Sequence, residues 1–350
     1  MEHSRTYTGY IHFKRLFILI LAVLTLLTAL LAVCAGSAGI SPKDVILTLF
    51  GQGSSQNSTV IFNIRMPRIV TAIVAGIGLA TVGCAMQSLL KNPLADASTL
   101  GIAQGAAFGA SFAIIVLGAG RQSQTLDAIS ILNPYSVSIC AFIGSITSTL
   151  IILGLSRFKK ISPEAMVLSG VALSTMFSGA TTLLQYFASD VDVAAVVFWT
   201  FGDLGRTDWT QIIIMSIMTV ISLVYFLLNR WNFNALQNGE ETAKGLGVNV
   251  EGMRLIGMLI CSLTASTIVS FIGIINFIGL IAPHLIRRFI GNDYRYLLPS
   301  SALIGSLLLL LSDTAARLVV APVILPIGAI TSFLGAPLFL YLLFKGVNRK

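Results

Sequence analysis

Long stretches without a charged side chain dominate this sequence and restrict the folds open to it. An Arg-Met-Pro-Arg cluster at 65–68 and a Lys-Asn-Pro-Leu-Ala-Asp box at 91–96 enclose 22 uncharged residues, 69–90. Since about 20 apolar helical residues cross the hydrocarbon core of a bilayer, we expect the two polar segments on opposite faces of a membrane. The glycines of this stretch and its one amide, Gln87, predict a helix packed against other helices rather than against lipid.

The same pattern repeats along the chain. Only 36 of the 350 residues are charged, whereas a soluble domain carries about a quarter. We therefore predict an all-α, polytopic membrane protein with about ten transmembrane helices, forming one transmembrane domain over 1–350. The expected spans are 16–36, 69–90, 99–118, 134–156, 164–188, 209–228, 252–271, 276–289, 297–318 and 327–345.

The distribution of basic residues predicts the orientation of these spans. With a cytoplasmic N-terminus, sixteen Lys and Arg residues fall inside and six outside, as the positive-inside rule requires. Both termini are then cytoplasmic, and we expect the protein in the cytoplasmic (inner) membrane, surrounded by lipid. This distribution also accounts for the net charge of +8 without a nucleic-acid partner.

Short elements are expected between the spans on the outside. Ser41-Pro42 has the pattern of a helix start, with Ser as N-cap and Pro in the first turn, and predicts a short amphipathic helix to Phe50. The polar residues Gly51–Thr59 indicate a turn. Residues 193–201 are apolar but too few to span a bilayer, and we expect a short helix at the outer surface.

The longest polar stretch inside is 229–254. Its apolar residues have the spacing of two short helices, and Asn238-Gly239 favours a turn between them because glycine adopts a positive φ without steric cost. A solvated loop with incidental helicity is the alternative. A loop of this length is more often functional, so we predict a docking surface for a soluble partner.

Other classes of protein are disfavoured by what the sequence lacks. It has no G-x-x-x-x-G-K-[ST] phosphate loop, so we do not expect it to hydrolyse ATP. Its histidines are scattered and its cysteines lie in apolar runs without paired spacing, so we expect no catalytic residues, cofactor, metal site or disulfide. Ion-driven carriers normally need mid-membrane carboxylates, and Asp313 is expected to pair with Arg317 at i,i+4. An ion-gradient carrier and an intramembrane enzyme therefore remain as weaker alternatives.

A series of motifs, in a fixed order, resembles the permease subunits of type II ABC importers, the FecCD/BtuC family of iron–siderophore, haem and cobalamin permeases. The resemblance covers about residues 40–347. Its motifs are R-M-P-R at 65–68, K-N-P-L-A-D at 91–96, L-G-I-A-Q-G-A at 100–106, L-Q-N-G-E-E-T-A-K-G-L-G-V at 236–248, F-I-G-L-I-A-P-H at 277–284, L-S-D-T-A-A-R at 311–317 and L-P-I-G-A-I-T-S-F-L-G-A-P at 325–337.

The resemblance implies the type II ABC importer permease fold and a non-catalytic transport subunit. In this family a permease homodimer passes substrate along its axis, two copies of a separate ATPase subunit supply the energy, and an extracytoplasmic substrate-binding protein delivers the substrate. The implied substrate is a metal chelate, with ferric siderophore first and haem or cobalamin next.

The resemblance also assigns candidate sites. The ATPase-coupling loop corresponds to Leu236, Asn238, Gly239, Glu240, Glu241, Lys244, Leu246 and Gly247. Docking of the binding protein corresponds to Arg65, Arg68 and Arg317. The alternative for Arg65 and Arg68 is that their side chains snorkel to the membrane interface. Asp203 stands where the family commonly has serine.

The translocation path is expected along the fifth span. The family's cytoplasmic constriction corresponds to Ser162, Pro163 and Glu164, of which only Ser162 matches the family's hydroxyl pattern. Further along the span, hydroxyl groups could line a wide channel or could bond back to their own helix. The residues selected from this group are Ser174, Ser178 and Thr182.

Overall fold

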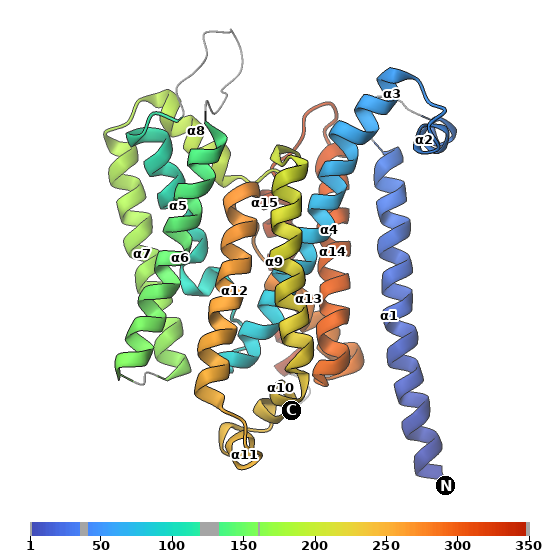
Figure 1. Ribbon diagram of the computed structural model, residues 1–350, viewed down its shortest axis with the longest axis vertical. Helices are drawn as coiled ribbons and strands as arrows, with labels where there is room; N and C mark the ends of the chain where they lie inside the picture. The colour runs from blue at the N-terminus through green and yellow to red at the C-terminus, as the bar shows by residue number, and fades with distance from the viewer. Residues whose placement is uncertain (1, 36–40, 120–132, 160–161, 348–350) are drawn as a thin grey trace.

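Helices make up every regular element that the computed structural model describes, over residues 2–35, 41–119, 133–159 and 162–347 (Figure 1). They are α1 (Glu2–Cys34), α2 (Pro42–Leu49), α3 (Ser55–Thr59), η1 (Val60–Arg65), α4 (Met66–Leu89), η2 (Ser98–Leu100), α5 (Ile102–Ser111), η3 (Phe112–Val116), α6 (Pro134–Lys159), α7 (Pro163–Tyr186), α8 (Asp190–Thr200), η4 (Leu204–Arg206), α9 (Trp209–Leu228), α10 (Arg230–Gln237), α11 (Glu240–Gly245), α12 (Val250–Ile272), α13 (Ile278–Ile290), α14 (Tyr294–Leu318) and α15 (Ile327–Val347).

A helix occupies each of the ten stretches expected to span the membrane. Among the described residues, seven helices are long and apolar enough to cross a bilayer, and Ile102–Val116 and Ile327–Tyr341 are shorter apolar helices. The tenth, α13, has 13 residues. The prediction of an all-helical, polytopic membrane protein is therefore confirmed.

The short elements largely follow the predictions as well. The hydroxyl of Ser41 accepts a hydrogen bond from the Asp44 amide (3.2 Å), and Pro42 opens α2. The external helix expected within 193–201 begins earlier, as α8. The two helices expected within 229–254 are α10 and α11.

The predicted polar turn at Gly51–Thr59 is wrong over its second half. Ser54 accepts a hydrogen bond from the Asn57 amide (3.2 Å) and starts a helix that continues through α3, η1 and α4 to Leu89. The segment before Pro67 is a π-helical turn, which makes room for a proline ring that would otherwise meet the carbonyl one turn earlier. Arg65 and Arg68 consequently lie along a helix and not in an external loop.

Helix α4 lies at the centre of the bundle, between α9, α12, α13 and α14 (Figure 1). Gly76 of α4 lies against the backbone of Gly305 and Ser306 in α14, and Gly83 lies against the backbone of Gly279 in α13. Backbones can approach this closely because glycine has no Cβ. The sequence prediction of a protein-packed helix is therefore confirmed for α4.

Two connections interrupt the long helices inside the bundle. One, 91–101, joins α4 to η2 and α5, and the other, 273–277, joins α12 to α13. Both contribute to one small cavity of about 20 Å³, which Asp96 and Ser98 line from the first connection and Asn276 from the second. The two connections therefore lie next to each other, although they are far apart in the sequence.

The glycine contact between α4 and α13 can be tested by adding a single methyl group. A Cβ on Gly83 would overlap the Gly279 carbonyl, so we expect Gly83→Ala to destabilise the protein by about 1–3 kcal/mol. Gly154 of α6 has no atom within 4 Å of such a methyl group, so Gly154→Ala should leave stability unchanged or raise it by up to about 1 kcal/mol. Thermal unfolding of both variants in one detergent measures the difference. Equal melting temperatures would show that α4 does not depend on this contact.

Candidate functional site

The loop between α9 and α12 is a folded helix pair with a fixed base. Phe233 of α10 is fully buried and stacks on Tyr294 at the start of α14, with ring centroids 4.6 Å apart. The amide side chain of Asn234 accepts a hydrogen bond from the backbone of Tyr294 (2.7 Å) and donates one to Asp293 (3.1 Å). These contacts hold α10 rigidly against α14.

The predicted turn between the two helices is confirmed. Gly239 has φ +114°, a conformation that side chains rarely adopt, and it serves as the N-cap of α11. Gly247, at the far end of α11, also has a positive φ of +82°. The turns on both sides of α11 therefore use residues without a Cβ.

The coupling-loop residues selected from the sequence divide into an exposed and a buried group. Leu236 is only 2 % exposed and belongs to the core, so it supports the loop and does not present a surface. Leu246 is 69 % exposed at the tip. Glu241 and Lys244 are exposed and form an ion pair of 3.1 Å. The exposed group, which we call the loop tip, is Asn238, Glu241, Lys244, Leu246 and Gly247.

Glu240, although assigned to the coupling loop, points inward and pairs within the chain. Its carboxylate pairs with Arg254 of α12 and lies 3.2 Å from the amine of Lys91. Partial burial by itself raises the pKa of Glu240, but the two cations outweigh it and hold that pKa below its usual value. Arg254 in turn donates a hydrogen bond to the carbonyl of Leu89 (3.2 Å), at the end of α4.

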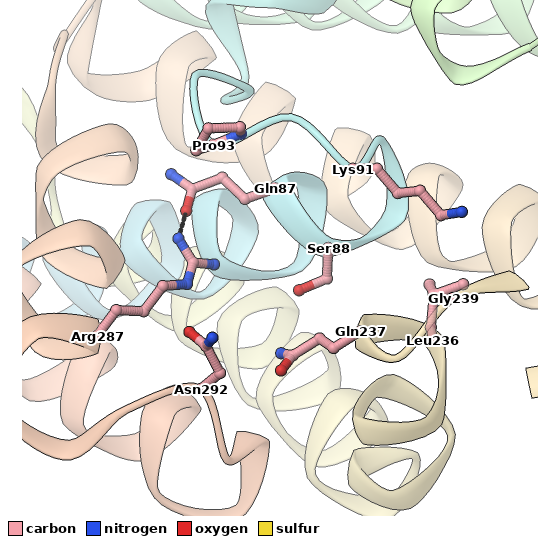
Figure 2. A pocket seen from close by; sticks show the side chains of 9 residues that line it. All are labelled: Gln87, Ser88, Lys91, Pro93, Leu236, Gln237, Gly239, Arg287 and Asn292. Atoms are coloured by element: carbon pink, nitrogen blue, oxygen red, sulfur yellow. Dashed lines mark hydrogen bonds between the residues drawn. The ribbon is translucent and has the colours of Figure 1, made fainter. Parts of the chain in front are cut away.

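A cleft of about 410 Å³ opens between α4, α13 and the α10–α11 pair, lined by residues from all three (Figure 2). In Figure 2, Arg287 reaches across from α13 and donates a hydrogen bond to the side chain of Gln87. The amide of Gln87 also donates to the carbonyl of Leu280 (3.2 Å). Lys91 and Gly239 line the other side of this cleft, so the loop and the end of α4 share one surface.

At the opposite end of the bundle lie the three arginines predicted to dock a binding protein. All three are mostly buried and engaged within the chain. Arg65, 6 % exposed, donates to the carbonyls of Val33 (2.6 Å) and Cys34 (3.3 Å) of α1. These bonds satisfy carbonyls that the end of helix α1 leaves without an intrahelical partner.

Asp313 joins the other two arginines. Its carboxylate, 1 % exposed, accepts from Arg68 (2.7 Å) and from Arg317 (2.9 Å), so the predicted i,i+4 pair with Arg317 is confirmed. The Arg68 contact was not expected, because the two residues are 245 positions apart and no local spacing signals it. Asp203 lies 3.4 Å from Arg68 as well, which gives this acid a partner within the chain.

The segment predicted to form the cytoplasmic constriction, Ser162, Pro163 and Glu164, lies at the start of α7. The Ser162 hydroxyl accepts from the Ala165 amide (3.3 Å) as N-cap, and Pro163 and Glu164 form the first turn. The Ser174 hydroxyl donates to the carbonyl of Gly170 (2.8 Å). These bonds are the ones a helix start and a helical hydroxyl normally make.

Further along α7, much of the helix surface lacks a partner in the single chain. The Thr182 hydroxyl donates to the carbonyl of Ser178 (3.0 Å), and both residues are exposed. In the most apolar 18-residue stretch of α7, only 11 % of the residues are buried. In the corresponding stretch of the helix that contains α4, 78 % are buried. Helix α7 therefore presents a face that the rest of the described chain does not cover.

Metal-binding chemistry is not apparent in the part of the chain that the structure describes. No group of three or more His, Cys, Asp or Glu side chains there lies close enough to hold a metal ion. Cys34, Cys84, Cys140 and Cys261 are free thiols.

Comparison with known proteins gives consistent matches. The FecCD transport family matches residues 24–345. The chain is 50 % identical over 349 residues to a Methanocaldococcus jannaschii protein named as an ABC transporter permease, covering 100 % of both. It is 38 % identical over 283 residues to the hemin transport system permease protein of Yersinia pestis, covering 81 % of this chain and 82 % of that one.

A solved structure, described as an inward-facing conformation of a metal-chelate type ABC transporter, has the same fold. It matches with a TM-score of 0.80 and 27 % identity, over 95 % of this chain and 99 % of that chain. The family expected from the ordered motifs is thus confirmed by sequence and by structure. This chain belongs to the FecCD transport family and is a membrane-spanning permease subunit of an ATP-binding cassette importer.

Proposed function

We propose that this permease imports a metal chelate, with ferric siderophores as the first class and haem or cobalamin as the next. The hemin permease and the metal-chelate transporter among the similar proteins support this class of substrate. A separate ATPase would supply the energy at the α10–α11 end. That end would face the cytoplasm together with both termini, as the excess of Lys and Arg on this side favours.

The observation that carries the proposal is the folded loop itself. Alpha10 is held to α14 by aromatic stacking and by Asn234, while the loop tip is exposed. A rigid base with an exposed tip suits a short helix that docks in a groove of a partner. Leu246 would supply the apolar contact of this docking, and Glu241 and Lys244 the polar contacts.

A second copy of the chain would cover the exposed face of α7. Transport along the axis of such a dimer would pass Ser178 and Thr182, and Ser174 less directly, since it is partly buried. Their hydroxyls already bond along the helix or lie at the surface, so they would offer a polar wall without binding a passing chelate tightly. The constriction would lie at Ser162, Pro163 and Glu164.

The opposite end would receive the substrate-binding protein. Arg68 and Arg317 are balanced by Asp313 and Asp203, whereas no carboxylate among the described residues lies within ion-pair distance of Arg65. Arg65 would therefore contribute the uncompensated positive charge that attracts an acidic partner. Arg68 and Arg317 would mainly shape this surface.

Purification of the tagged chain from its native host, in a mild detergent, tests the importer directly. We expect an ATPase with a phosphate-binding loop to co-purify, at about one copy per permease, because the loop tip would bind it. The copurified proteins can be identified and quantified by mass spectrometry. A chain that arrives alone and transports in liposomes on an ion gradient would instead support a secondary carrier.

Gly239→Val tests the turn of the coupling loop. A β-branched residue at φ +114° is strained by about 1–3 kcal/mol, which should displace α11 and reduce ATP-driven uptake by about tenfold or more. Insertion into the membrane should be normal. The control is Gly154→Val in α6, where the new side chain meets no neighbour at its Cβ. Wild-type uptake by the Gly239 variant would refute the docking-loop assignment.

Arg65→Gln tests the docking of the binding protein. Removing this charge leaves both ion pairs of Asp313 intact, and we expect association to slow by about two- to tenfold at low salt. The difference should shrink above about 0.1 M salt, where the Debye length falls below about 10 Å. Lys43→Gln, at an exposed lysine of α2, is the matched control, and surface plasmon resonance gives the rates. Equal rates for wild type and Arg65→Gln at low salt would leave Arg65 as an anchor for α1.

A further inference from the structure

Lys91 stands at the start of the connection between α4 and α5 in an uncommon conformation. Its φ is +49°, in the left-handed region that non-glycine residues rarely adopt. Glycine would adopt this backbone conformation without steric cost. A lysine at this position therefore suggests that its side chain makes a contact that glycine could not make. Its amine lies 3.2 Å from Glu240, the inward-facing acid of α11.

The connection that Lys91 opens packs tightly on α7. Gly170 of α7 lies against the backbone of Thr99 and Leu100, and a Cβ on Gly170 would overlap the Thr99 carbonyl. The hydroxyl of Ser148, in α6, donates to the carbonyl of Leu100. Because backbone meets backbone here, residues 98–101 cannot shift without moving α6 or α7.

Lys91 is not the only cation beside Glu240. Glu240 keeps Arg254 as a second partner, so Lys91 can leave it without stranding a charge in a partly buried site.

We propose that Lys91 is a positioning residue that couples the two sites, because its ion pair with Glu240 ties α11 to the connection that packs on α7. The proposal rests on the proposed function, because only a partner at the loop tip would displace α11. The ion pair passes the displacement to residues 91–101, and the contact with Gly170 passes it on to α7. Through these contacts, Lys91 would link the position of the α10–α11 loop, where the ATPase binds, to the position of α7 along the translocation path.

The complex with its ATPase, in lipid nanodiscs, provides the test. In a background with the native cysteines replaced, Ser178→Cys reports on α7 through its rate of modification by a maleimide, with and without ATP. We expect Lys91→Gln to reduce the ATP-dependent change in this rate about fivefold, while ATP hydrolysis continues. Lys91→Arg should restore the change, since it keeps the charge. Arg157→Gln, at an exposed arginine at the end of α6, is the matched control.

A wild-type response in Lys91→Gln overturns the proposal. If Lys91→Gln fails to fold, Lys91→Met carries the same test, since it also removes the charge and keeps a side chain of similar length. A wild-type complex that hydrolyses no ATP and shows no ATP-dependent change would refute the proposed function itself.

Discussion

The close approach of backbones around α4 is the constraint on which the rest of this permease depends. At Gly76 and Gly83 the helix touches the backbones of α14 and α13 directly. In a bilayer, where burial of apolar surface gives little drive for helices to associate, such contacts and the packing they permit hold helices together. They fix α4 at the centre, and α4 carries a candidate site at each of its ends.

The two ends share one arrangement of charge. In each, one carboxylate pairs with two cations: Asp313 with Arg68 and Arg317, and Glu240 with Lys91 and Arg254. One cation of each pair belongs to α4 or directly follows it. Because removing one partner of a buried ion pair can cost about 3–5 kcal/mol, a second cation keeps the acid paired if one contact breaks. The side chain of Glu240 is more exposed than that of Asp313, which is buried, so loss of one cation should cost less free energy at Glu240.

The sequence identified the regions of the candidate site better than the directions of its side chains. Glu240 and Glu241 are neighbours in one motif, and nothing local distinguishes them. Glu240 faces inward because Arg254 and Lys91, brought there by α12 and by the end of α4, neutralise its charge. In the same way, the position of Arg68 beside a span predicts an exposed charge. In the structure Arg68 is buried, because it pairs with Asp313 of α14.

The sequence by itself determined the helical class, the position of each span and the turn at Gly239. Each of these follows from local causes: a bilayer has no water to satisfy a backbone, so every segment must close its own hydrogen bonds, and glycine alone adopts the turn freely. Only the tertiary structure decided which helix is central, where Arg65 and Arg68 lie, and that Lys91 pairs with Glu240. Those outcomes depend on contacts between residues far apart in the chain, and charge or spacing along a single helix carries no information about them.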